Sequence, residues 1–199
     1  SVCNFIIHLG VGIVTTPSDG SVGTSQLAST AVTTAKIADD AVTKDKVSNL
    51  MYPAFHSSLS ANQTISDVTV TKVQFDTELF DTDNCYDNST NYRFTPTVAG
   101  KYFIYTHIDG DTTGINKTDQ VQLYIKKNGV TAAFIFDYPY TAAEANNIGL
   151  TLNTTLDMNG TTDYAEVFAY IDVVSGFNAR VGGNSSYSRS AFGAYRIGD

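Results

Sequence analysis

From Tyr52 to the end of the chain, short segments of alternating apolar and polar residues are separated by turn residues roughly every 8–15 positions. A period of two is the period of a β-strand, and no segment longer than about ten residues has helical periodicity. This excludes a parallel α/β fold and predicts an all-β sandwich or barrel. Tight turns are expected at Asn128-Gly129 and Asn159-Gly160. We expect strands at Ala54–Leu59, Thr69–Phe75, Tyr92–Pro96, Lys101–Asp109, Gln120–Lys127, Ala132–Tyr138, Gly149–Leu156, Tyr164–Val174 and Ser188–Ile197.

The charge balance narrows the class of partner. The chain has 199 residues with 12 Lys and Arg against 20 Asp and Glu, a net charge of -8, so a surface that follows nucleic-acid phosphates is not expected. Charged residues make up only 16% of the chain, as in β proteins with many turns. Cys3 and Cys85 are too few for a disulfide framework and are expected to be unpaired.

Three unlike parts follow one another along the chain. Residues 1–20 contain the apolar run Val2–Val14, which at about thirteen residues is shorter than the roughly 20 that a membrane-spanning helix needs. We therefore predict no membrane insertion, and a β segment that attaches to a partner protein. Residues 21–51 are predicted to form a stem, and residues 52–199 a knob domain.

The stem is predicted from a ten-residue repeat that occurs three times, at Ser21–Thr30, Ala31–Asp40 and Ala41–Leu50. Within the repeat an apolar residue recurs every five positions, a period that fits neither a strand nor an α-helix. A single chain cannot enclose so thin a line of apolar side chains. Such repeats need neighbours, which points to an ordered stem of several chains. The alternative is a flexible linker rich in Ser, Thr and Ala. The apolar anchors are Val22, Leu27, Val32, Ile37, Val42 and Val47.

Two of the expected strands carry large apolar side chains on both faces, namely Lys101–Ile108 and Tyr164–Val173. A sheet in a lone sandwich has one polar face, and aromatic rings left in water forfeit about 25 cal/mol for each Å². We therefore predict that identical copies cover the second face, although a ligand groove is a possible alternative. The predicted trimer interface consists of Tyr102, Phe103, Tyr105, His107, Tyr164, Phe168 and Tyr170.

Two stretches carry a resemblance to a known family. Tyr86–Phe94 reads Tyr-Asp-Asn-Ser-Thr-Asn-Tyr-Arg-Phe, and Ala99–Tyr105 reads Ala-Gly-Lys-Tyr-Phe-Ile-Tyr. Together they resemble the signature of the complement globular-head and tumour necrosis factor superfamily, with Ala99 where that family usually has proline. The resemblance spans roughly residues 53–199 and implies a ten-stranded antiparallel jelly roll that forms tight trimers. The stretch 30–38 of the repeat is similar to stems of bacteriophage tail fibres, which precede a trimeric knob.

Catalysis has no support in the sequence. His8, His56 and His107 lack metal-ligand neighbours at helical spacing, and there is no nucleophile elbow or phosphate-binding loop. We therefore predict that the chain is not an enzyme. One acidic cluster is a candidate calcium site, because hard cations need several oxygen ligands, and the alternative is a solvated acidic loop. The candidate ligands are Asp76, Glu78, Asp81, Asp83 and Asp87.

These observations predict a structural virion fibre protein, from a phage tail or head, at the virion surface or otherwise extracellular. Residues 1–20 would bind other virion proteins, and a trimeric knob would bind a glycan or protein of the host surface. The receptor-facing residues are predicted to be Tyr138, Tyr140, Asn184 and Tyr187. One alternative is a self-assembling extracellular filament or decoration protein that adds the N-terminal strand to a neighbour. Another is a monomeric carbohydrate-binding module.

Overall fold

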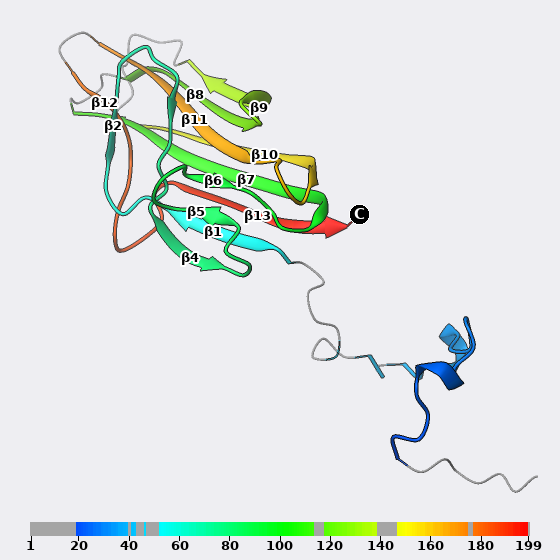
Figure 1. The fold of residues 1–199 in the computed structure, drawn as a ribbon. Helices are drawn as coiled ribbons and strands as arrows, with labels where there is room; N and C mark the ends of the chain where they lie inside the picture. The colour runs from blue at the N-terminus through cyan, green and yellow to red at the C-terminus, as the bar shows by residue number, and fades with distance from the viewer. Residues whose placement is uncertain are drawn as a thin grey trace, which may run out of the picture. The chain divides into compact units, whose positions relative to one another are not determined.

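The computed structural model describes residues 19–39, 41–42, 46, 52–113, 118–138, 147–174 and 177–198. The chain divides into two compact units, Ser1–Ser48 and Asn49–Asp199, which are considered separately (Figure 1). The predicted attachment segment Val2–Val14 lies outside the described residues.

The first unit repeats one backbone conformation every ten residues. Its two 3-10 turns, η1 (Thr24–Gln26) and η2 (Thr34–Lys36), occupy equivalent positions in successive repeats. Further equivalent bonds run from Ala31 N to Ala28 O at 2.9 Å and, ten residues later, from Ala41 N to Ala38 O at 3.0 Å. The sequence repeat is thus also a structural repeat. We call each ten-residue copy a decad.

In the described residues, the apolar anchors of the decads are only partly covered by their own chain. Five of them are 42–56% exposed, which is unusual for side chains that recur so regularly. These five are Val22, Leu27, Val32, Ile37 and Val42.

The second unit is a sandwich of two antiparallel sheets, which confirms the predicted all-β fold class (Figure 1). Sheet A contains, in spatial order, β2 (Gln63–Ile65), β12 (Ala179–Val181), β7 (Ala99–Thr112), β13 (Ala191–Gly198), β1 (Ala54–Ser58) and β4 (Thr77–Asp81), and β10 (Ile148–Asn159) also pairs with β7. Sheet B contains β5 (Tyr86–Asp87), β6 (Arg93–Phe94), β11 (Ala165–Val173), β8 (Thr118–Lys127) and β9 (Val130–Asp137), and β3 (Thr71–Lys72) also pairs with β11.

The strand segments in the described residues number thirteen rather than the expected ten, because several are only two or three residues long. The long expected strands are present with slightly shifted ends. The expected strand Thr69–Phe75 is reduced to the two residues of β3, whereas β2, β4, β5 and β12 had no sequence signal. The Asn128-Gly129 turn joins β8 to β9 with φ of 51° and 80°, the positive pair that a two-residue hairpin of type I′ requires.

An aromatic cluster between the sheets forms the centre of the core. Phe55 stacks on Tyr86 with ring centroids 4.5 Å apart and meets Phe192 edge-on at 4.9 Å. Tyr102 is fully buried beside them, and its hydroxyl donates to the carbonyl of Val98 at 2.7 Å. Its inclusion in the predicted interface is therefore wrong, because even-numbered residues of β7 point into the core of one chain and cannot meet a second copy.

Candidate functional site

Aromatic side chains form a continuous row across the outer face of sheet A. The row passes over four strands that lie side by side in the order β4, β1, β13 and β7. Ring centroids of successive members are 5.4–6.3 Å apart, the range in which aromatic rings attract one another. We call this row the aromatic ridge, and its members are Phe80, His56, Tyr105, Phe103 and Tyr195.

One hydrogen bond and one glycine fix the centre of the ridge. His56 Nδ1 and the Tyr105 hydroxyl are 2.9 Å apart. Gly193 lies opposite Tyr105 on β13, and a Cβ there would come within 2.4 Å of the Tyr105 ring. The missing side chain therefore lets the ring lie over the strand and reach His56. Burial, and secondly the charge of His107, lowers the pKa of His56 below its ordinary value, so this contact favours a neutral imidazole.

The remaining predicted interface residues belong to the other sheet. Phe103, Tyr105 and His107 face outward from sheet A, whereas Phe168 and Tyr170 lie on β11 in sheet B, with Tyr164 just before it. The set that the sequence places in one interface thus divides between two opposite surfaces of the sandwich.

On sheet B the protein's own cations lie against the rings of Tyr164 and Phe168, whereas Tyr124, Phe134 and Phe136 stack on one another and both phenylalanines are about half exposed. The Arg93 guanidinium lies 4.6 Å from the ring centroid of Tyr164. Lys126 Nζ lies 4.1 Å from the ring of Phe168, and Lys72 Nζ lies 5.8 Å from it while also pairing with Glu166. A ring with a cation on its face already has a favourable polar neighbour and tolerates contact with water.

The five acidic residues proposed as calcium ligands do not form a site. Asp76 accepts from the backbone N–H of Ser60 at 2.8 Å, and Asp81 accepts from that of Tyr86 at 2.9 Å. Backbone N–H donation, from Thr90 above all, holds the pKa of Asp87 well below its usual range. In the part of the chain that the structure describes, no three His, Cys, Asp or Glu side chains converge on a position for a metal. The carboxylates instead fix their own loops.

Near Asp81, Cys85 is buried and free, as expected from the sequence, whereas Cys3 lies outside the described residues. Burial of its thiol raises the pKa of Cys85, which makes the thiol unreactive.

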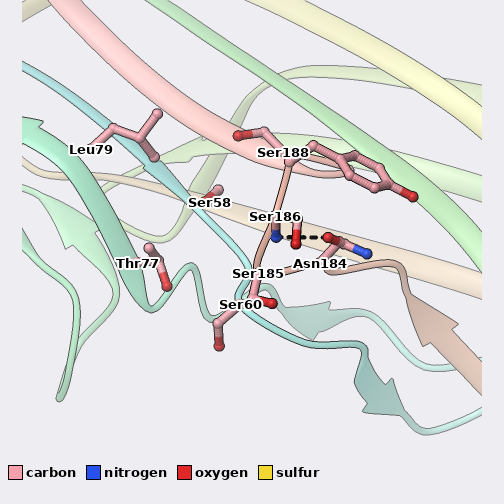
Figure 2. A pocket seen from close by; sticks show the side chains of 9 residues that line it. Ser58, Ser60, Thr77, Leu79, Asn184, Ser185, Ser186 and Ser188 are labelled. Atoms are coloured by element: carbon pink, nitrogen blue, oxygen red, sulfur yellow. Dashed lines mark hydrogen bonds between the residues drawn. The ribbon is translucent and has the colours of Figure 1, made fainter.

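A small pocket of about 190 Å³ opens between the end of β1, the edge strand β4 and the loop before β13. In Figure 2, Ser58 and Ser60 lie between Thr77 and Leu79 on one side and the 184–188 loop on the other. The residues that line the pocket are Ser58, Ser60, Thr77, Leu79, Asn184, Ser185, Ser186, Tyr187 and Ser188.

Two of the four predicted receptor-facing residues, Asn184 and Tyr187, line this pocket. Tyr138 follows the end of β9 and is 59% exposed, and Tyr140 lies outside the described residues. The sequence carries no signal for the wall formed by Thr77 and Leu79. Only the antiparallel pairing of β1 with β4 and β13 brings these residues close to the 184–188 loop. The lining itself holds no His, Asp or Glu, and the carboxylate that accepts from the Ser60 hydroxyl belongs to Asp76 beside the pocket.

No helix in the described ranges combines the length and apolar character needed to cross a bilayer.

Comparison with known proteins establishes the architecture. Neither the protein-family models nor the sequences of curated proteins match this chain. Among solved structures, a crystal structure of murine APRIL aligns with 72% of this chain and 98% of its own length at a TM-score of 0.50 and 11% identity. The globular domain of zebrafish complement 1qA protein aligns with 73% of this chain and 96% of its own at a TM-score of 0.47 and 18% identity. Eiger TNF from S. frugiperda aligns with 73% of this chain and 92% of its own length, at a TM-score of 0.49 and 11% identity. With the two-sheet antiparallel sandwich, the similarity to murine APRIL shows a jelly-roll fold.

Proposed function

We propose that this chain is a non-enzymatic virion fibre protein that acts as a homotrimer. In this proposal residues 52–199 form a trimeric knob that attaches to a host surface, and residues 21–51 form its stem. Residues 1–20 bind other virion proteins. The observation that carries the proposal is the aromatic ridge, a row of rings across four strands of sheet A that stays partly exposed in the single chain.

Burial of the ridge against identical copies explains its composition. Phe80 is 50% exposed, so its uncovered surface is of the order of 100 Å², and covering it contributes about 2–3 kcal/mol in each subunit. Copies of one chain supply such a cover most simply, because closed rotational symmetry repeats the same contact without leaving an open end.

The ridge is a better candidate for the subunit contact than the part of sheet B around Phe168 and Tyr164. Phe168 and Tyr164 already have cations on their rings, and bringing Lys126 or Arg93 into an apolar interface would require removing its charge from water. The ridge members instead contact one another, and their hydrogen bond between His56 and Tyr105 is satisfied within one chain.

The decads support the same assembly by a separate route. Their anchors Leu27 and Ile37 end successive 3-10 turns and are 48% and 42% exposed in a single chain. Side by side, three stems would offer each anchor a neighbour of the same kind at the same height, as in other repeat proteins whose units bury their apolar positions against neighbours.

The test is the molar mass of the full chain in solution, measured by analytical ultracentrifugation for two matched variants. Phe80→Lys places a charge on the ridge, at a position exposed enough for the single chain to fold. Val130→Lys places the same charge on the edge strand of the other sheet, at a side chain that is 72% exposed.

We expect a mass of three chains for the natural sequence and for Val130→Lys, and dissociation of Phe80→Lys at micromolar concentration. A natural sequence that sediments as one chain would contradict the trimer. Equal dissociation of the two variants would contradict the assignment of the ridge as the contact.

A further inference from the structure

The pocket beside β4 has an unusual chemical lining. Apart from Leu79, every lining residue carries a hydroxyl or an amide, and none carries a charge. The hydroxyl groups come from three separate segments that only the fold brings together (Figure 2). They belong to Ser58, Ser60, Thr77, Ser185, Ser186, Tyr187 and Ser188.

Part of this lining is held in place by the protein itself. Asn184 Oδ1 accepts from the backbone N–H of Ser186 at 2.7 Å, and the backbone N–H of Asn184 donates to the carbonyl of Leu59 at 3.0 Å. On the other wall, the hydroxyls of Ser60 and Thr77 both donate to the carboxylate of Asp76, at 2.6 Å and 3.1 Å. These bonds fix the two sides of the pocket before any ligand enters, which lowers the entropy cost of binding.

Another part of the lining remains available to a ligand. Ser185, Ser186 and Ser188 are exposed residues of the loop, and Ser58 lines the pocket at the end of β1. A hydroxyl donates once and accepts twice, so four of them in one small pocket present closely spaced donors and acceptors. Tyr187 adds an aromatic ring that is 64% exposed and whose apolar surface has little cover.

We propose that this pocket binds one neutral sugar residue of a surface glycan, a ligand assignment that rests on the attachment function proposed above. A sugar matches the lining because its hydroxyls pair with hydroxyl and amide groups, while its C–H face packs on an aromatic ring. Phosphate, sulfate and carboxylate ligands are disfavoured, because no lining residue offers a cation. The volume of about 190 Å³ is below the roughly 300–1,000 Å³ of pockets for drug-sized ligands, which limits the occupant to about one ring.

The experiment titrates the full-length protein with galactose, glucose, mannose and N-acetylglucosamine, and with sialic acid as the charged comparison. Binding is followed by NMR chemical shifts at sugar concentrations around 1–50 mM, because a single ring in a shallow site is expected to bind in the millimolar range. Tyr187→Ala removes the pocket ring. Ser188→Leu fills the pocket from an exposed position. Tyr52→Ala removes an exposed ring outside the pocket and serves as the control.

We expect saturable binding of at least one neutral sugar and weaker binding of sialic acid. We also expect Tyr187→Ala and Ser188→Leu to lose about tenfold or more in affinity while Tyr52→Ala binds normally. Absence of saturable binding, preference for sialic acid, or equal losses in both tyrosine variants would overturn the proposal. Because one chain supplies every lining residue, sedimentation of the same sample distinguishes this failure from failure of the trimer.

Discussion

At the scale of single residues, His56 lies where a proton is poorly tolerated. Its ring stands between those of Phe80 and Tyr105, with centroids 6.3 Å and 5.8 Å away. Desolvation is the main cause that lowers its pKa, and the charge of His107 adds to it. Covering the ridge with another subunit would increase that desolvation, so assembly and proton uptake at His56 oppose each other.

The low pKa of His56 predicts that the stability of the protein depends on pH. Because the folded pKa of His56 is below the ordinary value near 6.5, the unfolded chain binds more protons in mildly acidic solution, and the free energy of unfolding falls as the pH drops below about 6.5. Denaturation of the trimer with urea between about pH 7.5 and 5.5 measures this slope. We expect His56→Gln to flatten the slope. His107→Gln should keep most of it, because burial is the larger cause, and a slope that disappears in His107→Gln would contradict this account.

The aromatic residues show how far sequence reasoning reaches at this scale. Alternation along Lys101–Ile108 divides the strand into two faces but does not tell which face is the core, so buried Tyr102 was placed in the interface with Phe103 and Tyr105. Alternation does not tell which sheet a strand joins, so Phe168 could not be placed on the opposite surface from Phe103. Phe80 and Tyr195 were missed as ridge members because they join the ridge only through cross-strand pairing with His56 and Phe103.

At the scale of secondary-structure elements, turn chemistry was the more reliable guide. The turn after β10 depends on Asn159, whose side-chain oxygen accepts from the backbone N–H groups of Thr161, Thr162 and Asp163 at 2.9–3.0 Å. Short strands such as β5 were missed because two residues are too few to show a period. Edge strand β4 was missed because it mixes charged and apolar residues without clean alternation.

The glycine of this turn yields a prediction with an internal control. Gly160 has φ of +71°, and a Cβ there would lie 2.3 Å from the backbone N of Ala99. We expect Gly160→Ala to reduce the free energy of unfolding by about 1–3 kcal/mol or more, through strain and backbone collision. Gly149→Ala in the preceding strand β10 has open space around the added Cβ and should change the free energy of unfolding by less than about 1 kcal/mol. Denaturant unfolding of both variants checks the difference, and equal losses would contradict this explanation.

At the scale of the whole molecule, two separate features support the proposed trimer. The ridge offers one broad contact in the second unit, and the anchors offer several small contacts in the first. Contacts in two linked units reinforce one another, because formation of one raises the effective concentration for the other. The jelly-roll class was predictable from alternating segments and the Tyr86–Tyr105 motifs, whereas the pocket depended on pairings that no sequence pattern specifies.

If the stem and the knob both contribute subunit contacts, the full chain should resist dissociation on dilution better than the knob alone. We expect residues 52–199 alone to form a trimer, and the full chain to remain trimeric at concentrations about tenfold lower or more. Sedimentation at a series of concentrations measures both dissociation midpoints. A third protein, the full chain with Leu27→Asn and Ile37→Asn, should behave like the fragment. The control carries Ser29→Asn and Asp39→Asn at exposed polar positions and should behave like the natural chain. Identical midpoints for fragment and full chain would contradict a role of the decads in assembly.

The hydrogen bonds of each decad also affect how such a protein can evolve. The bond from Lys36 Nζ to the carbonyl of Ala31 recurs from Lys46 to Ala41, and each closes within five residues of its own donor. The bonds between decads, from Ala31 N to Ala28 O and from Ala41 N to Ala38 O, join equivalent positions, so a whole decad can be duplicated or deleted without leaving a broken partner behind. Gain or loss of whole decads would then lengthen or shorten the first unit in uniform steps, while the second unit keeps its sequence.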